Sequence, residues 1–159
     1  MRIGQGVDVH AFSADAGRPL RLGGTPIPGG PGLEGHSDAD VVLHALVDAL
    51  LGAAGLGDLG AVFGTADPAH AGVASSVFVA GALDRVTEAG WALVNADVTV
   101  VAQRPRLAAH RAAITDSVAD LLGVPAGAVN VKATTTDGLG FTGRGEGIAC
   151  LAVVLLAAR

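Results

Sequence analysis

The glycine-rich segment near the C-terminus has the composition of a phosphate-binding loop. Residues 132–147 read Lys-Ala-Thr-Thr-Thr-Asp-Gly-Leu-Gly-Phe-Thr-Gly-Arg-Gly-Glu-Gly, with three consecutive threonines, one arginine and five glycines. Such a segment exposes backbone N–H groups and short hydroxyl donors around a single guanidinium group, and these are the groups that hold phosphate in proteins. The segment therefore predicts a site for a phosphorylated ligand.

A second group of residues could bind a metal ion. Asp8 and His10 lie two apart in a stretch with strand-like alternation, so their side chains point to the same face of the strand. A helix predicted over residues 39–53 carries His44 on an otherwise apolar surface. If this helix packs on that strand face, two imidazoles and one carboxylate converge and leave a fourth position open, which is the pattern of catalytic zinc sites. Such a metal site would complement the phosphate-binding loop in phosphoryl chemistry.

The polar residues of this helix admit two interpretations. Asp40, His44 and Asp48 follow one another at intervals of four residues. Polar residues at this spacing commonly form a solvent-exposed stripe that binds nothing. The rest of the helix is too apolar to be freely exposed, which favours a metal site, and Asp48 could then orient an imidazole by a hydrogen bond. The spacing alone leaves both interpretations open.

Taken together, these motifs resemble the 2-C-methyl-D-erythritol 2,4-cyclodiphosphate synthase family along nearly the whole chain. The matching stretches are Gly4-x-Gly6-x-Asp8-x-His10-x-Phe12, residues 35–53 and residues 132–147, with shorter matches at 57–60 and 102–105. The resemblance implies that 4-diphosphocytidyl-2-C-methyl-D-erythritol 2-phosphate is converted into the cyclic diphosphate with release of CMP. This reaction belongs to the non-mevalonate route to isoprenoid precursors.

The resemblance also implies roles for individual residues. The positions that match the zinc ligands, one ion per subunit, are Asp8, His10 and His44. Asp137 matches an acid that holds Mg²⁺ or Mn²⁺ on the diphosphate, and His36 and Thr135 match residues that stabilise the transition state. The positions that match substrate contacts are Asp8, Val9, His10, His36, Ser37, Asp58, Leu59, Gly60, Phe63, Gly64, Thr65, Ala66, Asp67, Ala102, Gln103, Arg104, Pro105, Arg106, Leu107, Ala108, Thr134, Thr135, Thr136, Asp137, Phe141 and Arg144.

The sequence departs from the family pattern at a few positions. Residues 63–67 read Phe-Gly-Thr-Ala-Asp where Phe-Pro-Asp-Thr-Asp is frequent, which puts the contacts of residues 64–66 in doubt. Asp137 replaces the usual glutamate, so this metal ligand is one methylene shorter. His70 and His110 match no family position, and we expect them to be solvated.

Two other functions are compatible with the same residues. A zinc-dependent phosphate hydrolase would use metal-bound water and would need a general base near the open zinc position, for which only Asp48 stands out. A non-catalytic trimer could bind nucleotides or isoprenoid diphosphates along its axis. Retention of all three predicted zinc ligands together with Thr135 and Arg144 favours the cyclising enzyme.

Composition predicts an oligomer of single-domain subunits. The 159 residues fit one domain, 1–159. Apolar residues make up 50% of the chain, 24 residues are glycine, and charged residues make up only 16%, against about 25% in average proteins. A lone globule of this size needs more polar surface, so part of the surface is expected to be buried between subunits. The family resemblance implies a homotrimer with active sites between its subunits.

Charge and apolar patterning exclude several classes of protein. The formal net charge is −5 and Lys132 is the only lysine, so neither nucleic acid nor an anionic membrane is expected as the main partner. Cys150 is the only cysteine, which is compatible with a reducing compartment. The sequence shows no signal peptide, and its most apolar stretch, 148–158, is shorter than the roughly 20 residues of a membrane span. We expect a cytoplasmic protein.

The predicted elements define the fold class. Alternation and turn residues predict strands at 2–12, 20–27, 91–102, 129–135 and 148–157, and helices at 39–53, 75–89 and 105–122. Ser37 or Asp38 is expected to cap the first helix, and Ser75 the second. The last strand, near-continuously apolar, is expected to be buried on both sides and to lie near the threefold axis. The order of elements predicts an α+β two-layer sandwich, with one mixed β-sheet and helices packed on one face.

Overall fold

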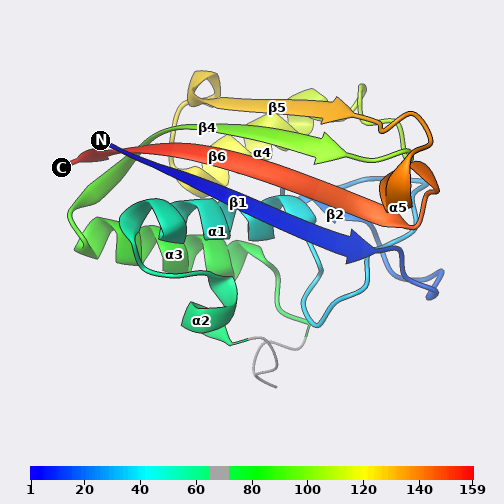
Figure 1. The fold of residues 1–159 in the computed structure, drawn as a ribbon, viewed down its shortest axis with the longest axis horizontal. Helices are drawn as coiled ribbons and strands as arrows, with labels where there is room; N and C mark the ends of the chain where they lie inside the picture. The colour runs from blue at the N-terminus through cyan, green and yellow to red at the C-terminus, as the bar shows by residue number, and fades with distance from the viewer. Residues whose placement is uncertain (65–71) are drawn as a thin grey trace.

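The computed structural model describes residues 1–64 and 72–159, which form a mixed α+β fold (Figure 1). In chain order the elements are β1 (Arg2–Ala11), β2 (Arg21–Leu22), β3 (Thr25–Pro26), α1 (Val41–Ala54), α2 (Leu59–Phe63), α3 (Ser76–Glu88), β4 (Trp91–Val101), α4 (Arg111–Leu122), the 3₁₀ turn η2 (Ala126–Ala128), β5 (Val129–Thr134), α5 (Gly140–Gly143) and β6 (Gly147–Ala158). Among the helices of these residues, none combines the length and apolar character needed to cross a bilayer.

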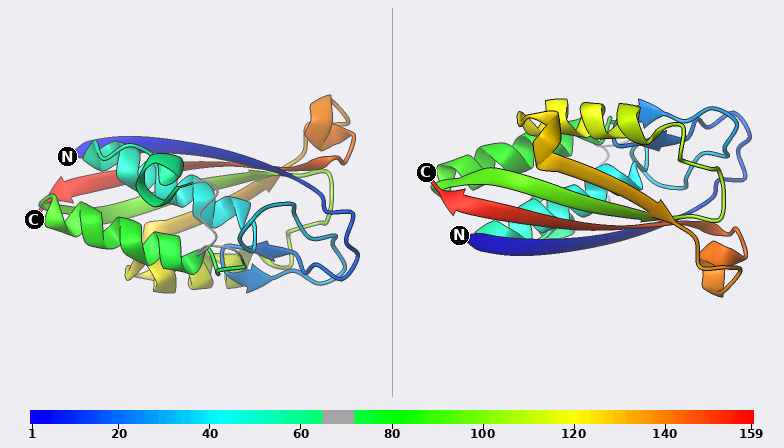
Figure 2. Two further views of the ribbon diagram at one scale, coloured as in Figure 1. Left: turned by 90° about the horizontal axis from the view of Figure 1, so that it is seen from below. Right: turned by 90° about the horizontal axis from the view of Figure 1, so that it is seen from above.

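The main sheet is mixed and has four strands in the order β1-β6-β4-β5. Strand β6 is antiparallel to both β1 and β4, and β4 is parallel to β5. Strands β1, β4 and β5 therefore end at the same end of the sheet, where α5 also lies, and both chain termini lie at the opposite end (Figures 1 and 2). Strands β1 and β5 form the two edges, so the residues that follow them are separated by the width of the sheet.

Helix α1 packs directly on strand β1 because the facing residues have almost no side chains. A Cβ atom at Gly6 would lie 2.0 Å from the carbonyl oxygen of Ala45, and one at Gly4 would lie 2.0 Å from that of Ala49. Two glycines on the strand thus face two alanines on the helix. This close approach brings His44, next to Ala45, within reach of the side chains on the same face of β1.

The N-terminus of α1 is capped by Asp40, so the predicted cap at Ser37 or Asp38 was wrong. The Asp40 carboxylate is fully buried and accepts hydrogen bonds from two N–H groups of the first helical turn, at 3.1 and 3.2 Å. It also accepts from the N–H groups of Gly23 and Gly24, at 2.8 and 2.7 Å. Four donors make this position suitable for a buried carboxylate. Asp40 therefore joins the β2–β3 turn to α1 and does not belong to a solvated stripe.

Two predicted elements differ from the structure in their extent. The strand predicted over 20–27 is a hairpin of β2 and β3, because Gly23 and Gly24 turn the chain at φ angles of 61° and 79°. The helix predicted from residue 105 begins at Arg111, since Leu107 is buried and its carbonyl accepts the N–H of His110 in a separate turn. The short helices α2 and α5 were not predicted.

Helices α1, α3 and α4 cover one face of the main sheet, as predicted, and within the described residues the other face is open. Over β1 and β6 this open face is apolar, with exposed side chains at Ile3, Val7, Val9, Leu151 and Val153. Val7 lies directly opposite Leu151, so these side chains form one surface. The prediction that β6 is buried on both sides was therefore wrong for the single chain, in which Val153 is 40% exposed.

Candidate active site

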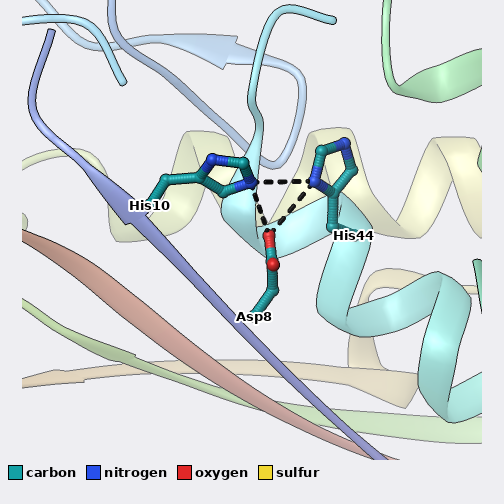
Figure 3. Close-up of side chains that lie close together, drawn as sticks. All are labelled: Asp8, His10 and His44. Carbon is teal, nitrogen blue, oxygen red and sulfur yellow. Dashed lines mark hydrogen bonds and ion pairs between the residues drawn. The ribbon is translucent and has the colours of Figure 1, made fainter. Parts of the chain in front are cut away.

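The three predicted zinc ligands lie together between β1 and α1. Figure 3 shows Asp8 and His10 reaching from the strand and His44 reaching from the helix toward one point. The Oδ2 atom of Asp8 lies 3.0 Å from Nε2 of His10 and 3.1 Å from Nδ1 of His44. The two imidazole nitrogens are 3.2 Å apart. These three atoms form a nearly equilateral triangle, which we call the ligand triangle.

Hydrogen bonds on the far side of each ring orient the imidazoles. His10 Nδ1 lies 2.5 Å from the carbonyl oxygen of Glu34. A carbonyl oxygen only accepts, so this nitrogen carries the proton and a neutral His10 turns its Nε2 lone pair toward the ligand triangle. His44 Nε2 contacts the Ser75 hydroxyl at 2.9 Å. Imidazoles held in this way by a second partner are typical of metal sites.

The ligand triangle has the dimensions of a zinc site. Its edges of 3.0–3.2 Å leave room for an ion at the distance of about 2.0–2.1 Å that zinc keeps from nitrogen and oxygen ligands. Two imidazole nitrogens and one carboxylate oxygen would fill three of four tetrahedral positions. The donor set and its spacing therefore fit a catalytic ion with one open position.

Hydrogen bonds connect the three side chains of the ligand triangle. Burial opposes ionisation of Asp8, but hydrogen bonds from His10 and His44 outweigh it and keep the pKa of Asp8 well below its usual range. Burial likewise opposes protonation of His10, but the hydrogen bond to Asp8 raises the pKa of His10. A metal ion would have to replace these protons, so its binding competes with acid.

Asp48, suggested above as the partner of an imidazole, lies elsewhere. Its carboxylate accepts the backbone N–H of Leu59 at 2.8 Å and so ties the start of α2 to α1. Burial raises the pKa of Asp48, and this hydrogen bond opposes the rise. The hydroxyl beside His44 belongs to Ser75, which the sequence presented only as a helix cap. Contacts between residues 31 positions apart leave no spacing signal in a single sequence.

A cavity of about 440 Å³ brings two of the predicted substrate-binding segments together. Its lining residues come from the ends of β4 and β5 and the start of α4: Ala102, Gln103, Pro105, Arg106, Leu107, Ala108, Arg111, Ala133, Thr134 and Thr135. The N–H of Ala102 donates to the carbonyl oxygen of Thr134 at 3.0 Å and joins the two segments. Arg111 was not predicted here because it was placed inside the longer helix expected from residue 105.

The loop after β5 exposes the remaining polar groups of the glycine-rich segment. The Thr135 hydroxyl donates to the Asp137 carboxylate at 3.1 Å, and both residues are exposed. Asp137 has a φ of 52° and Gly138 one of 84°, so the chain turns sharply here. The Arg144 guanidinium pairs with Glu146 at 2.6 and 3.2 Å. The loop thus offers a hydroxyl and a carboxylate at one end of the sheet.

The other predicted contacts in the described residues lie just before α1, on α2 and on β1. His36 is exposed and Ser37 is buried, with its hydroxyl 3.3 Å from Nε2 of His44. Asp58 caps α2, whose residues include Leu59, Gly60 and Phe63, and Gly64 ends it. Val9 points to the open face of the sheet. Thr65, Ala66, Asp67 and His70 lie outside the described residues.

One chain does not bring all these groups together. The ligand triangle lies at the edge formed by β1, and the cavity lies at the edge formed by β5. Strands β6 and β4 separate β1 from β5, although β1 and β5 end at the same end of the sheet (Figure 1). Thr135 and His44 therefore belong to two different parts of the surface of a single chain.

Known proteins are similar to this chain along almost its whole length. The model of the YgbB family matches residues 1–157. A curated 2-C-methyl-D-erythritol 2,4-cyclodiphosphate synthase from Azoarcus sp. (strain BH72) is 56% identical over 156 residues, which are 98% of this chain and 95% of the relative.

Solved structures agree with this similarity. A 2C-methyl-D-erythritol-2,4-cyclodiphosphate synthase in its CDP-bound form is 40% identical, with a TM-score of 0.88 over 98% of this chain and all of the other. The bifunctional IspDF from Campylobacter jejuni is 43% identical with a TM-score of 0.93, and the match covers 99% of this chain and 42% of that chain. The resemblance carried by the sequence motifs is thus confirmed, and the chain belongs to the YgbB family, together with the 2-C-methyl-D-erythritol 2,4-cyclodiphosphate synthases it matches.

Proposed function

We propose that the chain is a phosphorus–oxygen lyase that converts 4-diphosphocytidyl-2-C-methyl-D-erythritol 2-phosphate into 2-C-methyl-D-erythritol 2,4-cyclodiphosphate and CMP, in the non-mevalonate route to isoprenoid precursors. The observation that carries this proposal is the ligand triangle of Asp8, His10 and His44, in a chain 56% identical to a curated synthase of that name. The structure of a relative with CDP bound supports a cytidine nucleotide as part of the substrate.

The reaction needs no nucleophile from the protein. An oxygen of the substrate's own 2-phosphate forms a bond to the β-phosphorus of the diphosphate. The bond from that phosphorus to the oxygen shared with the α-phosphorus breaks, and CMP leaves with this oxygen. Holding both ends of a flexible substrate together can supply about 7–11 kcal/mol in favourable cases. The remaining task is to offset the repulsion between two anionic groups.

The chain's residues fit these two tasks. Asp8, His10 and His44 would hold zinc, and Asp137 would hold Mg²⁺ or Mn²⁺ on the diphosphate. When bound, these ions neutralise phosphate charge and polarise the reacting phosphorus. The cavity lined by residues 102–103, 105–108 and 133–135 would orient the cytidine end. His36 and Thr135 would donate hydrogen bonds to phosphate oxygens as charge develops on them.

We further infer that the protein is a homotrimer with each active site between two subunits. A single chain places the ligand triangle and the cavity at opposite edges of its sheet. Rotation about a threefold axis would set the β5 edge of one subunit beside the β1 edge of the next. Neighbouring subunits would also bury the exposed apolar surface over β1 and β6, because soluble proteins seldom leave such patches in water. Strand β6 would then lie near the axis.

Placing a charge on this apolar surface should separate the subunits. Val153 is 40% exposed on the open face of β6, so Val153→Asp would bury an unpaired carboxylate in the proposed interface. We expect the mass measured by light scattering to fall from three times 15.6 kDa to that of one chain, with loss of turnover. Val77→Asp, at a 55% exposed valine on α3, is the matched control and should remain trimeric. A parent protein that is a stable monomer would contradict the trimer.

The role of Asp137 can be tested by measuring the Mg²⁺ concentration that the protein needs for half-maximal turnover. Asp137→Asn removes the negative charge but keeps the size of the side chain, so roughly tenfold more Mg²⁺ should be needed for half-maximal turnover. Asp137→Glu restores a carboxylate and is the matched control, which should stay active at ordinary Mg²⁺ concentrations. An unchanged Mg²⁺ requirement in Asp137→Asn would show that this acid does not hold the second ion.

Removing the attacking group from the substrate tests the proposed reaction. The analogue that lacks the 2-phosphate cannot cyclise, so no CMP should appear when it is incubated with the protein, zinc and Mg²⁺. The complete substrate serves as the control in the same assay and should release CMP. Rapid release of CMP from the analogue would instead indicate a hydrolase that uses water.

A further inference from the structure

The hydroxyl group beside His44 is buried and has no capping role. Ser75 is 0% exposed, and its Oγ lies 2.9 Å from Nε2 of His44. Although Ser75 stands at the N-cap position of α3, its side chain caps no N–H group of that described helix. A serine at this position ordinarily accepts a hydrogen bond from the first helical turn. Its hydroxyl is instead directed to the metal-binding region.

The proton of this hydroxyl has a definite direction. Ser75 Oγ donates a short hydrogen bond to Oδ1 of Asp38. The same carboxylate oxygen accepts hydrogen bonds from the backbone N–H groups of Ser75, at 3.2 Å, and of Asp40, at 3.3 Å. An ionised carboxylate can only accept, so the Ser75 proton points to Asp38. The hydroxyl oxygen then has only lone pairs to offer to His44.

This direction fixes the tautomer of His44. Nε2 must carry a hydrogen in order to bond the Ser75 oxygen, and a neutral imidazole carries only one. When a metal ion is bound, Nδ1 is therefore left with its lone pair for the ion, whereas in the metal-free protein this atom donates to Asp8, 3.1 Å away in the ligand triangle. The Ser37 hydroxyl, 3.3 Å from Nε2 of His44, is a second and longer contact at the same nitrogen.

We infer that Asp38 and Ser75 are positioning residues that hold His44 in the tautomer and orientation needed for metal binding. This inference rests on the proposed function only in that it requires a metal at the ligand triangle. The hydrogen bonds from Ser75 to Asp38 and from His44 to Ser75 connect three separate parts of the fold. These are the segment before α1, the start of α3 and α1 itself. The Glu34 carbonyl does the same for His10 from another loop.

Removing the Ser75 hydroxyl tests this inference through zinc affinity. In Ser75→Ala, Nε2 of His44 loses its closest acceptor, and both tautomers become accessible. We expect zinc affinity, measured on the zinc-depleted full chain by competition with a chelator, to fall by about 10–100-fold. Ser76→Ala, one residue further on in α3, is the matched control and should bind zinc like the parent. The zinc-free Ser75→Ala protein loses the hydrogen bonds of this hydroxyl to Asp38 and His44, so its melting temperature should fall modestly while it stays folded at the assay temperature.

A second measurement needs no variant. Nitrogen-15 NMR of the histidine rings in the zinc-loaded parent protein should show Nε2 of His44 protonated and Nδ1 unprotonated. An Nδ1-protonated His44 in the zinc-loaded parent, or unchanged zinc affinity in a folded Ser75→Ala, would overturn the inference, as would a parent that binds no zinc. A parent that binds zinc with the expected loss in Ser75→Ala but releases no CMP from the substrate would refute the proposed function and leave the inference standing.

Discussion

Replacing His44 with alanine is expected to remove zinc from the protein and abolish turnover while the fold persists. Only Asp8 and His10 would then remain of the three ligands, one fewer than the three protein ligands typical of catalytic zinc sites. A bound ion stabilises the charge that develops in the transition state by several kcal/mol. Its loss should therefore decrease the rate by about 10³-fold or more. Helix α1 should remain folded, because alanine favours helix and the apolar residues of α1 stay buried.

The measurements are zinc content per chain, the rate of CMP release and the circular dichroism spectrum. His110→Ala is the matched control, since His110 stands at the start of α4 on another element and should lose neither zinc nor turnover. Full zinc occupancy in purified His44→Ala would refute the assignment of the ligand triangle as the zinc site.

Gly6→Ala is expected to damage stability and metal binding together. The added Cβ would lie 2.0 Å from the carbonyl oxygen of Ala45, a backbone atom that can yield only if α1 moves away from β1. Overpacking of this kind costs roughly 3 kcal/mol or more of the free energy of unfolding when the backbone must shift. The same movement would draw His44 away from Asp8, so zinc affinity should fall as well.

Chemical denaturation and chelator competition on the same preparation measure the two effects. Gly127→Ala is the matched control, because within the described residues nothing lies within 4 Å of a Cβ at that position, and its stability should change by less than about 1 kcal/mol. A Gly6→Ala protein with parental stability and zinc affinity would show that the contact between β1 and α1 does not set the geometry of the site.

The ligand triangle could be predicted from sequence because two periodicities define it. A period of two placed Asp8 and His10 on one face of β1, and the apolar surface around His44 indicated a packed helix. Only the packing of α1 on β1 had to be assumed, and Gly4 and Gly6 are the reason it occurs. The family resemblance then favoured a metal site over a solvated stripe, which the spacing could not do.

Features formed by residues distant in sequence could not be predicted in this way. The contacts of Ser75 with Asp38 and His44 connect separate elements and follow no local period. Asp40 became a fully buried cap because Gly23 and Gly24, on another turn, supply half of its donors. The exposure of β6 likewise depends on which face the helices cover, and an apolar run in one strand does not carry that information.

Phosphorus NMR of the complete substrate with the protein, zinc and Mg²⁺ tests the central claim most directly. If the chain catalyses cyclisation, the signals of the substrate's phosphomonoester and diphosphate should disappear together, and those of CMP and a cyclic diphosphate should appear in equal amounts. An open-chain bisphosphate beside CMP, in which water has taken the place of the 2-phosphate as nucleophile, would contradict the account.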